Sequence, residues 1–113
     1  MKKILPNEPS CPVDYAFKRI GGKYKGRLLW YLHIQNIMRY GELRKALSDV
    51  TPKMLTQALR ELEDDNLVFR EVYHEVPPKV EYSLTEVGKE LMPFIEYLKQ
   101  WGEKQIEKEH KQI

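Results

Sequence analysis

Four hydrogen-bonding side chains lie close together in residues 51–66, TPKMLTQALRELEDDN: they are Lys53, Thr56, Gln57 and Arg60. At 100° per residue they share one side of a helix, while the other side is apolar: Leu55, Ala58, Leu59 and Leu62. A helix packed along one face, with such donors on the other, suits a DNA major groove. Arg and Lys can satisfy guanine acceptors, and Gln can pair with adenine. An ordinary solvent-exposed helix face carries the same residue types. The neighbouring elements must therefore show whether this helix is placed to bind DNA.

The ends of this helix are marked in the sequence. Thr51 offers a side-chain acceptor and Pro52 follows it at the position where proline is preferred. The acidic residues crowd the last turns instead: Glu61, Glu63, Asp64 and Asp65. We expect Asp64 and Asp65 to turn the C-terminal end away from phosphate. Met54 could touch a thymine methyl or belong to the core.

The neighbouring segments place this helix in a recognisable motif. Residues 41–47 predict a two-turn helix, and a turn of three residues, 48–50, joins it to the helix of residues 52–65. After Asn66, two β-rich runs, residues 67–73 and 79–84, flank Pro77 and Pro78 and predict a hairpin. A hairpin directly after a helix-turn-helix is a wing, here about residues 67–84, and we expect it on the DNA backbone or in the minor groove.

Further helices flank this motif on both sides. Apolar spacing predicts a helix over residues 12–20, ended by Gly21 and Gly22, and a more apolar one over residues 24–34. Thr85 is expected to cap a closing helix that Pro93 kinks or restarts. The predicted fold is mainly α with a small β-hairpin (α+β), a winged helix-turn-helix with extra N- and C-terminal helices.

Composition favours one globular domain. The chain has 113 residues, 42% of them hydrophobic and 32% charged, with a net charge of +2. We predict a flexible arm over residues 1–10 and one domain over residues 11–110. No apolar run approaches the ~20 residues of a membrane span, and the N-terminus does not read as a secretory signal. A single cysteine, Cys11, fits a reducing compartment, so we expect a cytoplasmic protein without contact to a membrane.

Enzyme chemistry finds little support in the sequence. The histidines lie in separate elements without ligand spacing: they are His33, His74 and His110. Gly21 and Gly22 before Lys23 lack the strand and spacing of a phosphate loop, and no serine has a plausible base partner. We expect no catalytic residues, no metal and no cofactor.

Several cations outside residues 51–66 are candidates for the DNA backbone. On the segment that precedes the three-residue turn they are Arg39, Tyr40 and Arg44, and on the wing they are Arg70, His74 and Lys79. Basic residues also lead the helix of residues 24–34, where a helix N-terminus favours anions: Lys23, Lys25 and Arg27. Any of these side chains could equally be a solvated bystander.

The chain resembles the HxlR-type winged-helix regulators, a bacterial and archaeal family near the MarR group. The resemblance covers about residues 11 to 103 and rests on five blocks: CPVDYAFKRIGGKYKGRLLWYL, RYGELRKAL, TPKMLTQALRELEDDNLVFREVY, VPPKVEYSLTEVGKEL, and Trp101 with Gly102. Departures are Tyr24, where the family leads us to expect Trp, and Gly26 inside a helix.

The resemblance implies a transcriptional regulator that binds a pseudo-palindromic operator as a homodimer. The physics agrees, because one recognition helix reads only a few base pairs and two half-sites lie about 34–36 Å apart.

Apolar residues in excess of a winged-helix core support the dimer: Val13, Phe17, Ile20, Phe94, Ile95, Leu98 and Trp101. The alternative is that the closing helix folds back onto its own subunit.

Some family members sense oxidants or electrophiles through a cysteine placed like Cys11. Cys11 lies at a helix N-terminus, where a thiolate is favoured. The alternative is that Cys11 is a small buried hydrophobic residue. The sequence specifies neither a small-molecule effector nor the direction of regulation. A winged helix that only docks a protein is the rival function.

Overall fold

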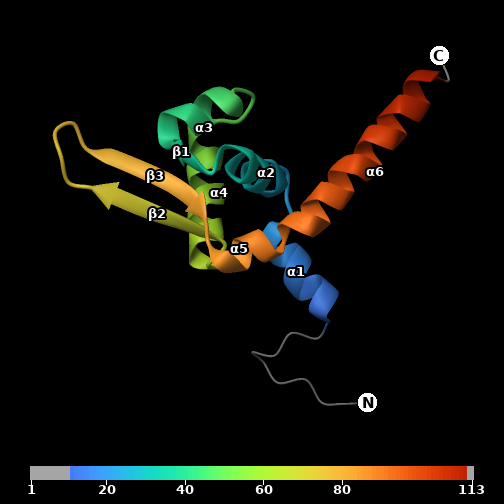
Figure 1. The fold of residues 1–113 in the computed structure, drawn as a ribbon, viewed down its shortest axis with the longest axis horizontal. Coiled ribbons are helices and arrows are strands. Elements are labelled where there is room, and N and C mark those ends of the chain that lie inside the picture. The colour runs from blue at the N-terminus through green and yellow to red at the C-terminus, as the bar shows by residue number, and fades with distance from the viewer. Residues whose placement is uncertain (1–10, 112–113) are drawn as a thin grey trace.

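The computed structural model describes residues 11–111, and the predicted arm of residues 1–10 lies outside them. Figure 1 shows the order of the elements along the chain. The helices are α1 (Pro12–Ile20), α2 (Lys25–Gln35), α3 (Tyr40–Ala46), α4 (Pro52–Asp64), α5 (Glu86–Glu90) and α6 (Met92–Lys111); the strands are β1 (Ile37–Arg39), β2 (Val68–Tyr73) and β3 (Lys79–Leu84). The arrangement is a winged helix-turn-helix, with α3 and α4 as the helix pair and β2 and β3 as the wing. None of the described helices is long and apolar enough to cross a membrane.

Helix α4 begins and packs as its sequence predicts. The Thr51 hydroxyl accepts a hydrogen bond from the Met54 amide at 3.2 Å, which satisfies one of the donors left free at a helix start. Its apolar face is buried: Leu55, Ala58, Leu59 and Leu62. Leucines from α2, α3 and the turn before α4 complete the same core: Leu28, Leu29, Leu32, Leu43 and Leu47. The core therefore fixes which side of α4 faces outward.

The sheet contains one strand more than the predicted hairpin. Strand β1 pairs antiparallel with β3, and β3 pairs with β2, so the strand order is β1-β3-β2. Strand β1 has only three residues, which give no local sequence signal for the strand that they pair with. The pairing register puts Met38, Tyr82 and Arg70 in one row on one face, and Arg39, Glu81 and Glu71 in the next row on the other face.

Pro93 restarts the closing helix rather than kinking it. Helix α5 ends at Glu90 and α6 begins at Met92, so the proline occupies the first turn of α6, where no amide donor is needed. The Thr85 hydroxyl caps α5 by accepting from the Gly88 amide at 2.9 Å, and it donates to the Asn66 carbonyl at 2.7 Å. From this anchored start, α6 extends away from the body of the molecule (Figure 1).

Small shifts separate the other predicted helices from the observed ones. Helix α2 starts and ends one residue later than predicted, and Asn36, with φ of 67°, terminates it. Helix α3 starts at Tyr40, because the Glu42 carboxylate accepts from the Arg39 amide at 2.8 Å and fixes the helix start there. These shifts move no candidate residue from one element to another except Tyr40, which belongs to α3.

Candidate nucleic-acid interface

The outer face of α4 presents the side chains expected to read bases. Because the leucines on the opposite side are buried, the following residues are all exposed: Lys53, Thr56, Gln57 and Arg60. Met54 is 44% exposed and lies outside the core, which resolves the two roles considered for it in favour of the surface. Within residues 11–111, neither Lys53 nor Arg60 forms an ion pair, so both cations are available to a ligand.

A hydrogen bond joins the reading face to α3. The Tyr40 hydroxyl lies 3.1 Å from Oγ1 of Thr56, and Tyr40 is half-buried at the start of α3. This contact holds the Thr56 side chain in one orientation. It also places the phenol of Tyr40, predicted as a backbone contact, directly beside the base-reading residues. Arg44 lies further along α3 and is exposed, as is Lys45, which the sequence reasoning did not select.

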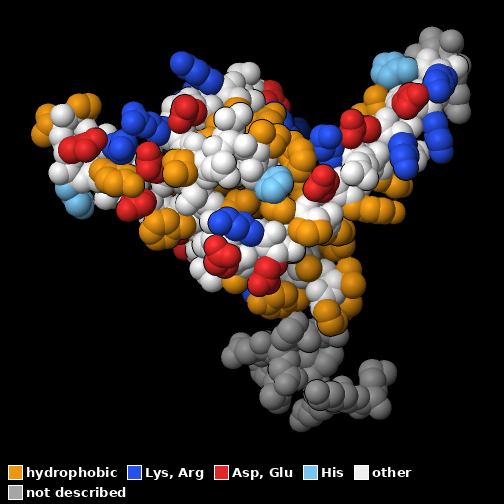
Figure 2. Space-filling model, viewed as in Figure 1, with side chains coloured by type: hydrophobic (Ala, Val, Ile, Leu, Met, Phe, Trp, Pro, Cys, Tyr) orange, Lys and Arg blue, Asp and Glu red, His pale blue; other side chains and the backbone are white. Residues whose placement is uncertain are grey.

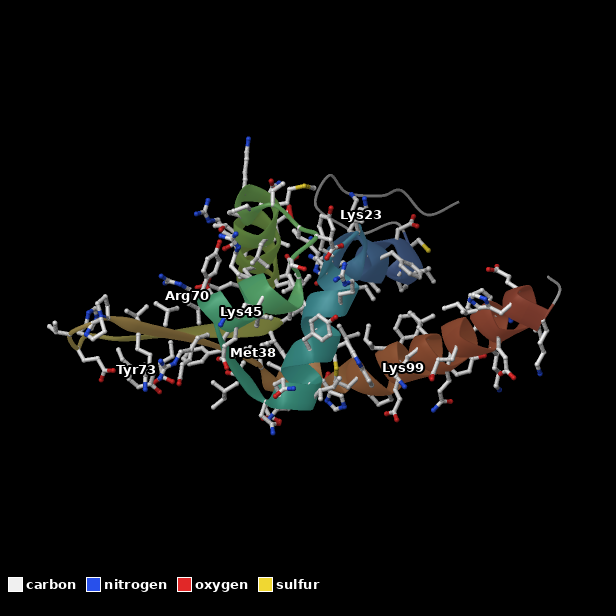
Figure 3. All side chains as sticks on the ribbon, turned by 90° about the horizontal axis from the view of Figure 1, so that it is seen from above. Lys23, Met38, Lys45, Arg70, Tyr73 and Lys99 are labelled. Carbon is white, nitrogen blue, oxygen red and sulfur yellow. The ribbon has the colours of Figure 1, made fainter. Side chains whose placement is uncertain are left out.

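The wing places Arg70 on the same side as α4. A surface cleft of about 300 Å³ lies between α4 and the sheet, lined by Thr56, Leu59, Arg60, Glu63, Arg70 and Tyr82. Figure 3 shows Arg70 on the α4 side of the wing and Tyr73 on the opposite side. Arg60 and Arg70 therefore border one cleft, although ten residues separate them in sequence. His74 follows β2 in the loop that joins the two strands of the wing.

Arg39 and Lys79 lie on the other face of the sheet. They share that face with Glu71, Glu81 and Tyr73, according to the pairing register. The Lys79 ammonium is 3.8 Å from the Glu81 carboxylate and 4.4 Å from the centre of the Tyr73 ring. A hydrogen bond to Glu71, assisted by partial burial and by Glu81, raises the pKa of Tyr73 to about 12. The structure does not bring Arg39 and Lys79 together with α4.

At the predicted anion site at the start of α2, two of the three cations form ion pairs with acidic residues. Arg27 donates to both carboxylate oxygens of Asp49, and Lys25 lies 3.3 Å from the Glu61 carboxylate. These residues tie α2 to the turn before α4 and to α4 itself. Asp65, expected only to repel phosphate, lies 4.0 Å from Nε of Arg19 on α1. The sequence could not show these pairs, because their partners are distant along the chain.

The apolar residues expected at a dimer interface divide into two sets. Ile20 and Ile95 are each 8% exposed and belong to the protomer's own core, so they are not available to a partner. The remaining five are exposed: Val13, Phe17, Phe94, Leu98 and Trp101. Phe17 and Phe94 pack edge to face with 6.4 Å between ring centres, which joins α1 to α6. Hydrophobic side chains gather along α6 and below its base in Figure 2.

An apolar groove of about 310 Å³ lies between α1 and the helices α5 and α6. It is lined by Pro12, Val13, Ala16, Phe17, Ile20, Leu91 and Phe94. Cys11 stands next to this groove as the N-cap residue of α1; it is half-buried, and its side chain makes no capping hydrogen bond. No group of three His, Cys, Asp or Glu side chains that could hold a metal occurs in the described part of the chain.

Comparisons with known proteins place the chain among transcriptional regulators. The family model described as HxlR-like helix-turn-helix matches residues 19–110. The chain is 52% identical over 102 residues to YybR, an HTH-type transcriptional regulator of Bacillus subtilis (strain 168), covering 90% of this chain and 81% of YybR. It is 47% identical over 97 residues to the regulatory protein MalR of Fusobacterium mortiferum, covering 86% of this chain and 92% of MalR.

Solved structures agree with this assignment. The redox regulator HypR in its oxidized form is 51% identical, with a TM-score of 0.79 over 83% of this chain and 96% of HypR. The diamide-treated YodB of B. subtilis is 31% identical, with a TM-score of 0.71 over 86% of this chain and 96% of YodB. The matched proteins are regulators rather than enzymes. The chain is a member of the HxlR-like helix-turn-helix family of transcriptional regulators.

Proposed function

We propose that this regulator binds double-stranded DNA sequence-specifically, with α4 in the major groove and the wing against the neighbouring backbone. The observation that carries the proposal is the exposed donor face of α4, held outward by buried leucines on its other side. Base contacts fall to Lys53, Thr56, Gln57 and Arg60. Backbone contacts fall to Tyr40, Arg44, Arg70 and His74. Such a protein would act in the cytoplasm, where a prokaryotic chromosome lies.

The operator proposed for it is pseudo-palindromic and is bound by a homodimer. A single α4 contacts only a few base pairs, so useful affinity and specificity require two half-sites one helical turn apart. The exposed apolar groove between α1 and α6, together with Leu98 and Trp101, supplies a surface that a second copy of the chain would cover. Because α6 extends away from its own body, folding back onto the same subunit does not cover Leu98 or Trp101.

Selection from a random pool of duplexes tests this function. Purified protein should enrich a motif with two-fold symmetry and half-sites about 10–10.5 base pairs apart, centre to centre. Footprinting on the enriched duplex should then protect both half-sites. The binding constant should fall steeply with salt, with a log–log slope of about −0.9 for each phosphate contacted. A pool without enrichment, together with a shallow salt dependence, would reject DNA reading.

We further propose that Cys11 responds to oxidants or electrophiles. It stands at the start of α1 beside the proposed dimer surface, and two structural relatives are HypR, called a redox regulator, and YodB, solved after diamide treatment. With one cysteine in the chain, two Cys11 thiols of a dimer, or one thiol and a small thiol, would form a disulfide while diamide takes up two electrons and two protons. Diamide should release wild-type protein from the enriched duplex and should not release Cys11→Ser; equal responses would exclude this role.

Protein docking is the second candidate, and one observation favours it. Ile37 and Phe69 are 54% and 52% exposed on the sheet face that carries Glu71 and Glu81, away from α4. A partner protein could cover this face whether or not DNA is bound. If docking were the whole function, the selection above would yield no motif, and replacing Arg60 would leave every interaction of the protein unchanged.

A further inference from the structure

A helix in the major groove lies between two phosphate backbones. The groove of B-DNA is about 12 Å wide, so cations are useful on both flanks of the inserted helix. On the wing flank of α4, Arg60 and Arg70 border the cleft described above. The other flank of α4 faces α1 and the turn from α1 to α2, where the sequence indicated Lys23 as one of three cations near a helix start and the proposed function names no DNA contact.

A second surface groove, of about 410 Å³, runs along that flank. From α4 it is lined by Met54, Gln57, Ala58 and Glu61, and from the opposite side by Phe17, Lys18, Gly21, Gly22, Lys23, Tyr24 and Lys25. Gln57 is one of the proposed base-reading residues, so the groove is continuous with the reading face. Lys23 lies at the start of α2, on the side of the molecule where α4 is exposed (Figure 3).

The charges lining this groove leave a positive surplus. Its single carboxylate, on Glu61, is neutralised by the half-buried Lys25, whose ammonium lies 3.3 Å away. Lys18 and Lys23 are exposed, and neither forms an ion pair with another residue in the range 11–111. The Lys23 ammonium lies 5.8 Å from the centre of the Tyr24 ring, within reach of a weak cation–π contact. Lys23 acts on Asp49 only through its charge, and Asp49 is already paired with Arg27, so two ammonium groups without a salt bridge to any described residue remain in the lining of the groove that Gln57 shares.

The turn between α1 and α2 is open at Gly22. Gly22 has φ of +95°, a conformation that side chains rarely adopt, and an added Cβ there would meet no atom within 4 Å. Gly22 therefore leaves the turn beside Lys23 open to solvent.

We infer that Lys18 and Lys23 bind the phosphodiester backbone on the side of the major groove away from the wing, so that duplex DNA is held on both flanks of α4. This inference rests on the proposed function, because it requires α4 to enter the groove. Ammonium groups that contact phosphates release condensed counterions without reading sequence. The two lysines would therefore contribute affinity equally on all duplexes, while Gln57 beside them contributes base preference.

The test compares the wild type with the double variant Lys18→Gln, Lys23→Gln. Fluorescence anisotropy gives the binding constant over a salt series, on the duplex enriched by selection and on a duplex of unrelated sequence. The double variant should lower the magnitude of the log–log salt slope by about 1.8, from about 0.9 for each contact, and should weaken both duplexes by the same factor. Replacing both residues by Arg should restore the slope, because guanidinium also binds phosphate.

A matched control uses two exposed lysines far along α6, in the variant Lys104→Gln, Lys108→Gln, which changes the net charge equally and should leave the slope unchanged. If the variant at residues 18 and 23 retains the wild-type slope, or if the control loses as much, the backbone contact is rejected while DNA binding stands. If the wild type itself shows no salt-dependent binding, the proposed function fails and takes this inference with it.

Discussion

Arg27 of α2 donates two hydrogen bonds to Asp49, at 2.8 and 2.9 Å, one to each oxygen of the carboxylate. Asp49 belongs to the turn that leads into α4, two residues before the capping residue Thr51. A bidentate arginine–carboxylate pair fixes the plane of both groups. The pair therefore ties the turn before α4 to α2.

This pair makes stability depend on pH in a definite direction. Its hydrogen bonds from Arg27 hold the pKa of Asp49 below its ordinary value. A group with a lowered folded pKa stabilises the protein above its unfolded pKa, about 3.9, and the stabilisation is lost as pH falls through the folded value. Asp49→Asn should therefore be less stable than wild type at pH 7 in urea unfolding, and the difference should shrink below about pH 4.

The control for Asp49 is Glu103→Gln, which removes the carboxylate of an exposed pair within α6, 3.0 Å from Lys99. Asp49 and Glu103 are equally exposed, but Lys99 donates one hydrogen bond where Arg27 donates two, so Glu103→Gln should change the urea midpoint little at any pH. A constant difference between Asp49→Asn and wild type from pH 7 to pH 2 would show that the ionised carboxylate does not stabilise the fold.

Neighbouring residues on α4 should differ sharply in their contribution to stability. Leu55 is 0% exposed, whereas Met54 beside it is 44% exposed. Leu55→Ala should lower the free energy of unfolding by about 2–5 kcal/mol, because it leaves a cavity in a packed core. Met54→Ala should cost less than about 1 kcal/mol. Urea unfolding monitored by circular dichroism measures both, and equal losses would place Met54 in the core.

Two glycines should respond oppositely to alanine. A Cβ on buried Gly88 would collide with the carbonyl oxygen of Leu67, so Gly88→Ala must push α5 away from the segment that joins α4 to the wing. We expect a loss of about 1–3 kcal/mol. Gly26 lies within α2 with no atom within 4 Å of an added Cβ, so Gly26→Ala should stabilise by up to about 1 kcal/mol. Thermal unfolding of the two variants reports the sign directly.

Local sequence patterns predicted the helices and strands, but they could not predict ion pairs between residues that are distant along the chain. The spacing of leucines and the cap at Thr51 are contained within α4 itself, so the helix and its exposed face could be predicted from residues 51–66. The ion pairs of Lys25 and Arg27 could not be predicted, because their partners Glu61 and Asp49 lie 36 and 22 residues further along the chain. The sequence of a basic segment therefore does not show which of its cations are already paired with carboxylates.

Strand pairing explains the remaining differences in the candidate site. Arg39 and Lys79 are cations near the helix-turn-helix in sequence, but the side chains of a strand alternate between two faces and the register decides which face each joins. The pairing of β1 with β3 places Arg39, and the pairing of β2 with β3 places Lys79, on the face away from α4. Likewise, periodicity puts Ile20 and Ile95 in apolar stripes, but whether a stripe meets its own core or a partner depends on how the helices pack.

Arg60 and Arg44 should produce different kinds of defect in DNA binding. Arg60 lies on the reading face beside the wing cleft, whereas Arg44 lies on α3, where only the backbone is expected. Arg60→Ala should cost about 1–3 kcal/mol at one base position and relax preference there. Arg44→Ala should weaken all duplexes alike and lower the magnitude of the salt slope by about 0.9. Binding to the enriched duplex and its single-base variants distinguishes them, and identical profiles would reject the division of roles.

Leu98 should be critical for dimerisation without being critical for folding of the protomer. It is 42% exposed on α6, one helical turn from Phe94 and from Trp101, so Leu98→Glu leaves the core of one chain intact. In a two-fold dimer each substitution counts twice. If truncating each leucine alone costs about 3 kcal/mol, the dimer dissociation constant rises roughly 10⁴-fold, and binding to a duplex with two half-sites weakens with it.

The charge-matched control Gln100→Glu lies on the same exposed helix. Light scattering at micromolar concentration should find Gln100→Glu dimeric and Leu98→Glu monomeric, both with wild-type circular dichroism; a monomeric wild type would remove the second half-site from the mechanism.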